Sequence, residues 1–518
     1  MNGNDHHNQP STMKTQMTFF RRLTFSIVFP ALLISAAFCS AADPALTSWL
    51  TAYSGQYARI YETDADRTSN TTLTTWPRGG RSVNMGAGGQ TTPTYCGIHE
   101  VSYSDNWVYL RTTGLGSHIM GPWYNMGALF QNMPKNIAII YRIPRTPQVA
   151  ASKTLTGLGP IGLFVDGVVM FDSRDAFSVS SPTGTEAQPG LGIWNRDAYV
   201  NEAQTFDPAA AHQPPSGQYH YHANPPALRY LLGDNINFDP VTKYYSENTD
   251  RTEFQHSPIL GWARDGYPIY GPYGYAVSNN PASGVRRMIS GFQPRNLSAA
   301  GVSTRTNLPV WAQRAQNRTN LTASQYGPAV SASYPFGRYL EDNDYLGDLG
   351  MAQGDQFDLD EFNGRYCVTP EFPNLHYAYF TCINSNGTPH FPYNIGRQFY
   401  GSPTGNTVTS VTEPVTTNFV GGPKMALKLR APERDANSGD VTLTWSSVDG
   451  GTYQVEAVNS LPSTWTAIHT NLPAAQTNYP MPSVVSRFVE TGAAQGGATN
   501  RFYRINRTGL ATYDSNGF

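Results

Sequence analysis

The residues of this chain that most clearly suggest chemistry are four consecutive ones, Tyr219-His220-Tyr221-His222. In an extended strand successive side chains point to opposite faces, so both histidines would project to one side and both tyrosines to the other. Two imidazoles on one face can supply half of a metal site, because imidazole binds both copper and zinc well. The face that carries the tyrosines is expected to pack.

Distant histidines could complete such a site. His118 and His256 each lie in a short loop beside a Gly-Pro or Ser-Pro pair, which restricts the backbone locally. We therefore expect His118, His220, His222 and His256 to be the metal ligands. The residues expected in a supporting or alternative role are His212, Asp265, Asp172, Asp175, Tyr219 and Tyr221. The alternative, in which these histidines and tyrosines are hydrogen-bonded parts of the core, stays open.

Short motifs rich in Gly, Pro, His and Asp recur between about residues 94 and 402. They include Thr113-Gly-Leu-Gly-Ser-His118-Ile-Met-Gly121-Pro122-Trp123, Met170-Phe-Asp172-Ser-Arg-Asp175-Ala176, Trp194-Asn-Arg-Asp197, Thr205-Phe-Asp207, Gly217-Gln-Tyr219-His-Tyr-His222, His256-Ser-Pro258-Ile-Leu-Gly261-Trp-Ala-Arg-Asp265-Gly266, Leu359-Asp-Glu-Phe-Asn363-Gly-Arg365 and Thr369-Pro-Glu-Phe-Pro373. Together these motifs resemble the signatures of the YHYH domain family. That family is defined by sequence, so the resemblance implies a domain and no particular activity.

The run from Gly217 to His222 also resembles the strand motif of cupredoxin-like copper domains. In those domains a glycine turn leads an alternating aromatic strand into a copper ligand. This local similarity favours copper over zinc as the bound metal.

A second kind of metal site is suggested by the acidic residues between positions 341 and 361. Carboxylates and backbone carbonyls are the ligands that Ca²⁺ prefers, and Asp358 and Asp360 are the candidates. The alternative is a solvated acidic loop.

The N-terminus has the pattern of an export signal. Arg21-Arg22 precede an apolar run, Leu23–Phe38, and the small residues Ser40, Ala41 and Ala42 fit cleavage before Asp43. The run is too short for a comfortable membrane span, although a retained anchor is the alternative. We expect an exported protein, periplasmic, cell-surface or secreted, with no membrane span after signal removal.

The exported chain would keep three cysteines, Cys96, Cys367 and Cys382, so at least one would be unpaired. Cys367 and Cys382 fall in two apparent neighbouring strands and could form a disulfide across a hairpin. Two free thiols are the alternative.

Composition predicts a mainly β protein. Among its 518 residues 12% are aromatic, and Gly and Pro are plentiful, which suits strands joined by many turns. We expect a large β-sandwich-like domain with long ordered loops over residues 43–400. A Thr-, Gly- and Pro-rich linker would follow over 401–424, then a small β-sandwich over 425–507 that resembles fibronectin type III-like modules. With a net charge of −2 and 14% charged residues, the chain has no basic surface for nucleic acid.

Three functions remain open from the sequence. The first is an exported protein that binds copper or zinc through histidines. The second is a secreted hydrolase that uses His and Asp as acid–base groups, with His118, His222, Asp172 and Asp265 gathered in one pocket. The third is a surface module that binds carbohydrate or protein and whose histidines are structural. Whether the protein is an enzyme is not decided, and its partner could be an extracellular polymer or a surface protein.

Overall fold

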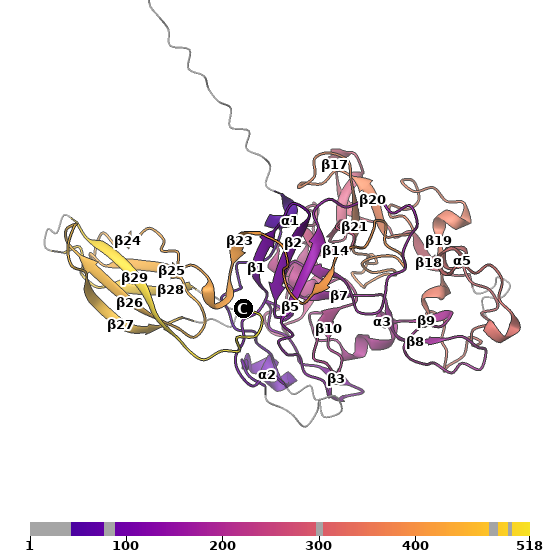
Figure 1. Ribbon diagram of the computed structural model, residues 1–518, viewed down its shortest axis with the longest axis horizontal. Helices are drawn as coiled ribbons and strands as arrows, with labels where there is room; N and C mark the ends of the chain where they lie inside the picture. Colours follow the sequence, from indigo (N-terminus) through magenta and orange to yellow (C-terminus); the bar gives the residue numbers. More distant parts are fainter. Residues whose placement is uncertain (1–42, 77–88, 297–303, 476–484, 496–499) are drawn as a thin grey trace, which may run out of the picture. The chain divides into compact units, whose positions relative to one another are not determined.

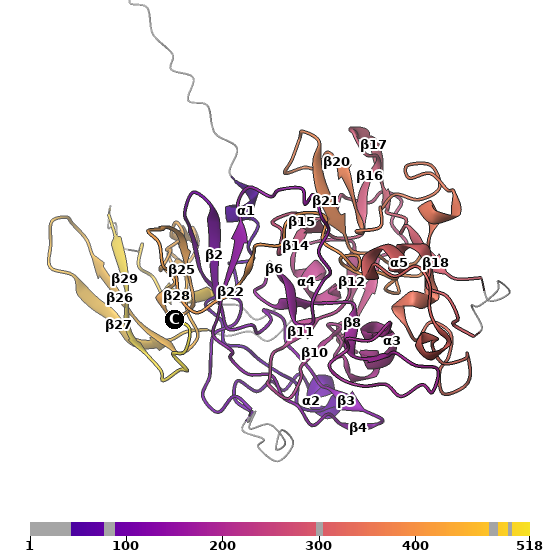
Figure 2. The same cartoon turned by 45° about the vertical axis from the view of Figure 1, so that its right-hand side comes forward.

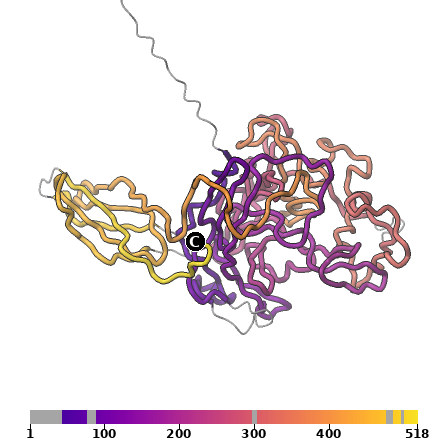
Figure 3. Tube along the Cα trace, viewed as in Figure 1, coloured from indigo at the N-terminus to yellow at the C-terminus, as the bar shows by residue number. Residues whose placement is uncertain are grey.

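The computed structural model describes residues 43–76, 89–296, 304–475, 485–495 and 500–518. They are mainly β-structure, as predicted: Figure 1 shows strands spread along the chain, and Figure 3 follows the path of the same trace. The predicted export signal, residues 1–42, lies outside the described residues. None of the helices within them has the length and apolar character to cross a bilayer.

Two large sheets carry the main core. The first has five strands in the order β22 (Asn406–Val408), β5 (Ile139–Pro144), β2 (Trp107–Thr112), β1 (Ile98–Tyr103) and β23 (Thr416–Val420). The second has eight, in the order β10 (Ala211–His212), β11 (His220–Tyr221), β7 (Val169–Phe171), β6 (Pro160–Phe164), β14 (Ile259–Ala263), β15 (Pro268–Tyr270), β21 (His376–Phe380) and β20 (Gly364–Cys367). Val101 and Leu110 of the first sheet belong to the same buried cluster as Leu163 and Val169 of the second. This arrangement is sandwich-like, as expected.

A hairpin at Asp166-Gly167 joins β6 to β7, which pair antiparallel. Gly167 adopts φ +84°, and its N–H donates to the Phe164 carbonyl at 2.9 Å. A Cβ at this glycine would lie 2.4 Å from Oγ1 of Thr112, so both conformation and space require glycine.

Short two-stranded sheets and helices lie in the long loops between these strands. The small sheets are β3 (Tyr124–Asn125) with β4 (Ala128–Leu129), β8 (Arg174–Val179) with β9 (Trp194–Asp197), β12 (Ile236–Phe238) with β13 (Tyr245–Glu247), β16 (Tyr273–Val277) with β17 (Asn280–Arg287), and β18 (Phe292–Pro294) with β19 (Asn343–Tyr345). The helices are α1 (Pro44–Thr47), α2 (Asp64–Ser69), α3 (Ala198–Glu202), α4 (Pro226–Leu231) and α5 (Val310–Gln316), and the 3₁₀ helices are η2 (Ala203–Thr205), η3 (Ala323–Gln325), η4 (Leu340–Asp342), η5 (Leu346–Leu349) and η6 (Gly422–Lys424).

Residues 401–424, whose composition predicts a linker, contribute two strands to the first sheet. β22 pairs with β5, and β23 pairs with β1, so these strands form its two edges. Threonine and valine have high β-propensity, and the edge of a sheet offers unpaired backbone groups that such a segment can satisfy. Composition alone did not reveal this pairing, because it depends on strands almost 300 residues away.

The C-terminal residues form two three-stranded sheets. Their orders are β24 (Glu433–Arg434), β25 (Val441–Ser446), β28 (Val485–Glu490), and β27 (Thr466–Pro473), β26 (Gly451–Val458), β29 (Phe502–Leu510). A separate buried cluster between them includes Leu443, Trp445 and Val455. Strand residues alternate between buried and partly exposed along β25, which is the period-two pattern that the sequence shows there.

A buried charge cluster holds the chain just after the histidine pair. Arg229 on α4 is completely buried and contacts Asp234 at 2.5 Å, Glu247, and Oδ1 of Asn224 at 3.2 Å. The chain leaves β11 through His222 and Asn224 and enters α4 at Pro226, so this cluster fixes the exit of the strand.

Replacing Arg229 by methionine should lower the free energy of unfolding by about 3–5 kcal/mol, because two buried carboxylates lose their cation. Urea unfolding followed by tryptophan fluorescence measures this loss. Arg434→Met, on the exposed strand β24, is the control and should change stability by no more than about 0.5 kcal/mol. Equal stability of the two variants would contradict this role for Arg229.

Candidate metal centre

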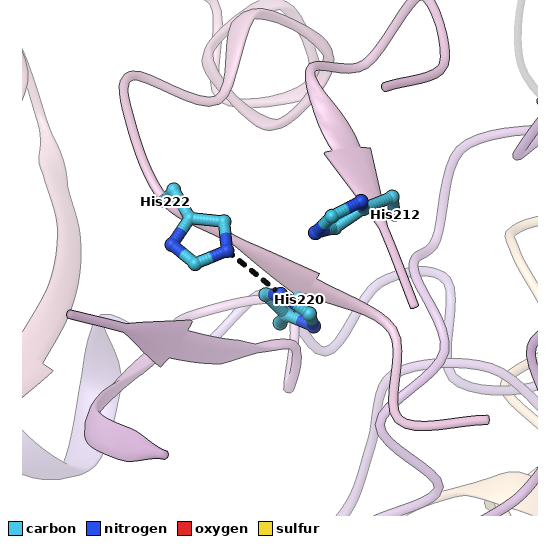
Figure 4. A group of neighbouring side chains, drawn as sticks. All are labelled: His212, His220 and His222. Carbon is cyan, nitrogen blue, oxygen red and sulfur yellow. Dashed lines mark hydrogen bonds between the residues drawn. The ribbon is translucent and has the colours of Figure 1, made fainter. Parts of the chain in front are cut away.

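The site is built on the hairpin of β10 and β11, which Figure 2 shows side by side. His212 on β10 is the direct cross-strand partner of His220 on β11. Directly opposed residues point to the same face of an antiparallel pair, with Cβ atoms about 5 Å apart. His222 follows His220 by two residues and shares that face. Figure 4 shows the three imidazoles turned toward one another, and their ligand atoms all lie within 4.8 Å of each other.

The turn between the two strands contains Pro214 and Gly217. The N–H of Gly217 donates to the Pro214 carbonyl at 2.9 Å, and Gly217 has φ +83°. A Cβ at Gly217 would lie 2.7 Å from the side chain of Lys135. The turn therefore depends on glycine, and it sets the register that places His212 opposite His220.

Each imidazole of the cluster has its Nδ1 held by an oxygen acceptor. The Nδ1–H of His220 donates to the Gln218 carbonyl at 2.9 Å, and that of His222 donates to the Asp172 carbonyl at 2.7 Å.

For His212 the acceptor is Oγ1 of Thr205, at 2.7 Å. The hydroxyl of Thr205 donates its only proton to the Glu202 carbonyl at 2.7 Å, so it must accept from His212. All three Nδ1 atoms thus carry the proton, and the Nε2 atom of each neutral ring offers a lone pair.

Glu202 adds a carboxylate to the three imidazoles. It is the last residue of α3, whose first turn is capped by the side chain of Asp197 accepting from the N–H of Val200. Its Oε2 lies 3.2 Å from Nε2 of His222 and 3.5 Å from Nε2 of His212. Nε2 of His220 lies 3.0 Å from Nε2 of His222. The carboxylate of Glu202 therefore lies beside two of the three imidazoles.

The protonation states of these groups follow from burial and from Glu202. Burial lowers the pKa of His212 to about 3 and lowers the pKa of His220 well below its usual value. Burial also disfavours charge on His222, but the hydrogen bond and negative charge of Glu202 outweigh it and raise the pKa of His222. Burial alone would raise the pKa of Glu202, whereas His222 lowers it. The site therefore favours one positive charge beside this carboxylate.

Aromatic rings orient the imidazoles. Phe171 stacks on His220 with ring centroids 3.9 Å apart, and Phe206 lies 4.8 Å from His212 and 6.0 Å from His222. The cluster lies at the wall of a cavity of about 290 Å³. Its lining combines apolar side chains with the site groups and includes Phe130, Leu158, Phe171, Phe177, Asp172, Arg174, Asp175, Glu202, His212, Pro214, His220 and His222.

The tyrosines point to the other face, as predicted, and His118 lies with them. Tyr219 donates to Oδ2 of Asp207 at 2.8 Å, and Nε2 of His118 lies 3.0 Å from the Tyr219 hydroxyl. Tyr221 lies 3.4 Å from Oδ2 of Asp166. His118 was expected to be a ligand, but the strand lies between it and the imidazole cluster.

The other expected ligand, His256, is not brought to the cluster either. Its Nδ1–H donates to the Ser257 carbonyl at 2.8 Å, and its ring packs against Tyr270 and Tyr275. Asp265 is also elsewhere, since Oδ2 accepts from the Tyr379 hydroxyl at 2.6 Å and from the Gly401 N–H at 2.8 Å.

Asp172 and Asp175 line the cavity but are paired with arginines. Asp172 contacts Nε of Arg174 at 3.0 Å, and its backbone carbonyl holds His222. Asp175 contacts Nε of Arg196 at 2.7 Å. Of the four residues expected to form an acid–base pocket, only His222 and Asp172 line this cavity.

The residues expected to bind calcium have other partners. Asp358 forms an ion pair with Arg286 at 2.6 Å and accepts from the N–H of Ile289 at 2.7 Å. Asp360 accepts from the N–H of Gly364 at 3.0 Å and from the Tyr377 hydroxyl at 3.0 Å. These carboxylates organise turns with protein donors.

Of the two alternatives for Cys367 and Cys382, the structure shows free thiols, both buried, as is Cys96. The β20–β21 hairpin places Cys367 opposite His376. Cys382 lies beyond the end of β21 and outside this pairing. Its thiol contacts Oδ1 of Asn363 at 2.9 Å.

The structure places His212 and Glu202 beside the histidine pair, whereas the sequence interpretation gave His212 a supporting or alternative role and did not name Glu202. The signal for His212 was the Pro214-Pro215-Ser216-Gly217 turn, which predicts a hairpin and thereby a cross-strand partner for His220. Glu202 had a weaker signal, because Asp197 is a good N-cap and implies a short helix that ends near Glu202. Neither signal specifies the register of the hairpin or the direction of the helix.

His118 should make the metal-free protein sensitive to acid. Burial lowers its pKa in the folded state to about 3, whereas in the unfolded chain it titrates near 6.5. The unfolded state therefore binds more protons between these values, and stability is lost as pH falls below 6.5. Replacing His118 by glutamine should remove about 2 kcal/mol of the loss between pH 8 and pH 5.

Urea unfolding at both pH values in the presence of a chelator measures this difference, with pH 8 as the reference at which His118 is neutral in both states. An unchanged pH dependence in the variant would show that His118 does not contribute.

A comparison with known proteins gives one match. Residues 140–392 match the family model described as YHYH protein. No curated protein and no solved structure is significantly similar to the chain. The matched segment contains Glu202, His212, His220 and His222, whereas His118 lies before it. The match supports the assignment of residues 140–392 to the YHYH family.

Proposed function

We propose that this protein binds one divalent transition metal ion through Nε2 of His212, His220 and His222, with Glu202 as the fourth ligand. The observation that carries the proposal is the pair of Nε2 atoms of His220 and His222 at 3.0 Å, in rings whose Nδ1 protons are already donated to carbonyls. Two lone pairs at this distance repel unless a cation lies between them. In the absence of a metal ion, the additional proton of His222 supplies the positive charge between the two nitrogen atoms.

The spacing of the four atoms suits a small coordination sphere. Metal–nitrogen and metal–oxygen bonds of zinc proteins are about 2.0–2.2 Å, so two ligand atoms on one tetrahedral ion lie roughly 3.3–3.6 Å apart. The separation of 3.5 Å between Glu202 and His212 lies in this range, those of 3.0 and 3.2 Å at His222 are slightly shorter, and the three imidazole ligand atoms lie within 4.8 Å of one another. The carbonyl and hydroxyl acceptors on Nδ1 are the supports that metal-binding histidines generally have.

Three imidazoles and one carboxylate are suitable for both copper and zinc. No cysteine or methionine lines the cavity among the described residues, so the set is not that of a blue-copper centre. At a nitrogen and oxygen site the Irving–Williams order places Cu²⁺ above Zn²⁺ in affinity. We therefore propose that the site binds copper more tightly than zinc, in agreement with the resemblance of Gly217–His222 to the cupredoxin-like strand motif.

Native purification should yield roughly one equivalent of copper or zinc per chain. His220→Gln and His222→Gln should each abolish the bound metal, and His212→Gln should do so as well, because each removes one of three neutral ligands. Mass spectrometry of the metals in purified protein gives the content. His118→Gln and His256→Gln are matched controls that should retain it.

Full metal content in the triple variant of His212, His220 and His222 would refute the proposed site. Loss in the His118 or His256 variant, with a normal circular dichroism spectrum, would favour the ligand set expected from the sequence.

Thr205 offers a finer test, because it touches no metal and only holds the Nδ1 proton of His212. Thr205→Val should lower metal affinity about 10- to 100-fold, as is typical for supports of metal-binding histidines. Competition with a chromogenic chelator measures the change. Thr113→Val is the control, since its hydroxyl is equally buried but donates to the Tyr95 carbonyl. Equal affinities in the two variants would contradict the role of Thr205.

The cavity favours metal-assisted hydrolysis as a second candidate function. A site held by three imidazoles on the wall of a 290 Å³ cavity could admit a water molecule and a small substrate. The metal ion would supply Lewis acidity there, and Glu202 and the Asp175 carboxylate would be the nearby acidic groups. An esterase activity that disappears in His220→Gln would identify this function.

We also propose that the protein is exported, on the basis of Arg21-Arg22 and the apolar run Leu23–Phe38. A surface or polymer partner would then be met outside the cytoplasm.

A further inference from the structure

A second cavity, of about 230 Å³, shares Arg174 with the metal pocket. Its lining includes Arg174, Leu191, Asn195, Gln316, Arg318 and Arg397. Three of these side chains are guanidinium groups, and no carboxylate lines the cavity among the described residues.

The three arginines come from distant parts of the chain. Arg174 begins β8, Arg318 follows α5, and Arg397 lies beyond β21. The fold thus gathers three positive charges at one place, which costs electrostatic energy unless negative charge accompanies them.

Arg174 has protein partners for most of its donors. It pairs with Asp172 at 3.0 Å, and its terminal nitrogens lie 2.9 Å from the Thr156 carbonyl and 3.4 Å from the Gly190 carbonyl. Its charge is largely balanced by Asp172.

Arg397 is less well satisfied. Its side chain is 8% exposed, and one terminal nitrogen donates to the carbonyl and the hydroxyl of Thr156 at 2.7 and 3.1 Å. Its Nε has no hydrogen-bond partner in the described part of the chain, and the same holds for the buried Nε of Arg318. A buried donor without a partner is costly, and a charged one especially so.

The surrounding charges leave the cavity positive. Burial and, to a smaller extent, the positive charge of Arg174 lower the pKa of Arg397 to about 10, against the opposing effects of Asp172 and Glu341. Glu341 is engaged by Asn195 at 2.7 Å and by Gln316 at 3.2 Å, and burial raises its own pKa to about 7. The two carboxylates therefore do not neutralise three guanidinium groups fully.

We propose that this cavity binds a tetrahedral oxyanion group, phosphate or sulfate, between Arg318 and Arg397 with Arg174 beside them. Guanidinium groups bind such oxygens through two parallel N–H donors, and Arg318 and Arg397 each bring a guanidinium group to the cavity wall. The cavity is partly open, with Leu191 largely exposed beside it, so both a free ion and an ester group on a larger molecule can enter.

The test uses the full chain stripped of metal with a chelator and titrated calorimetrically with sodium sulfate and sodium phosphate at constant ionic strength. We expect one saturable site for either anion, absent with sodium chloride. Arg318→Gln should weaken binding at least tenfold, because it removes one of the three guanidinium groups. Arg318 is only partly buried, so its loss leaves the core intact. Arg397→Lys should weaken it as well, since lysine keeps the charge but lacks the planar fork.

Arg314→Gln is the matched control. Arg314 lies on α5 near Arg318 but is exposed and pairs with Asp348 and Glu361. This variant should bind sulfate as the wild type does. Binding of glucose 6-phosphate as tightly as inorganic phosphate would identify an ester group as the occupant, and much weaker binding would identify the free ion.

Absence of saturable binding in the wild type, or equal affinities of Arg318→Gln and Arg314→Gln, would overturn the proposal. Repeating the titration with His220→Gln distinguishes anion binding at the arginines from anion binding at the metal site. This variant should bind sulfate as the wild type does. If sulfate binds only to metal-loaded protein and not to this variant, the anion is a metal ligand and the arginine site is refuted.

Discussion

Two imidazole nitrogens facing each other at 3.0 Å are the constraint on which the centre of this molecule depends. Each ring is locked by a hydrogen bond on its far nitrogen, so neither can turn away to relieve the repulsion of the lone pairs. A cation beside Glu202 removes that repulsion. The hairpin register, the glycine turn and the stacked Phe171 all act to keep the two rings in this arrangement.

Two arginine clusters elsewhere in the interior compensate their charges locally. Arg229 is matched by Asp234 and Glu247, and Arg305 by Asp342, and no partner side chain is more than 4% exposed. Such clusters are insulated from solvent and stabilise the fold only while they are complete.

The compensation is incomplete in two adjoining cavities. One has three clustered imidazoles with a carboxylate beside two of them, and the other has three guanidinium groups, two of them with an Nε atom that has no partner among the described residues. Arg174 lines both, and Asp172 links them, since its carboxylate holds Arg174 and its carbonyl holds His222.

Local sequence patterns predicted much of the fold. The aromatic- and turn-rich composition predicted mainly β-structure, which the structure shows. The errors came from pairings between distant segments. The sequence pattern placed Cys367 and Cys382 in two apparent neighbouring strands. In the structure the β20–β21 hairpin pairs Cys367 with His376 instead. Residues 401–424 have the composition of a linker, yet they pair with both edges of a sheet.

The candidate site divides in the same way. The sequence by itself determined that His220 and His222 share a face and that Tyr219 and Tyr221 occupy the other, because alternation along a strand is a property of the backbone. Only the tertiary structure decided that His212 and Glu202 join them while His118 and His256 do not. Those choices depend on a hairpin register and on the position of α3, which are set by packing among residues that no local pattern connects.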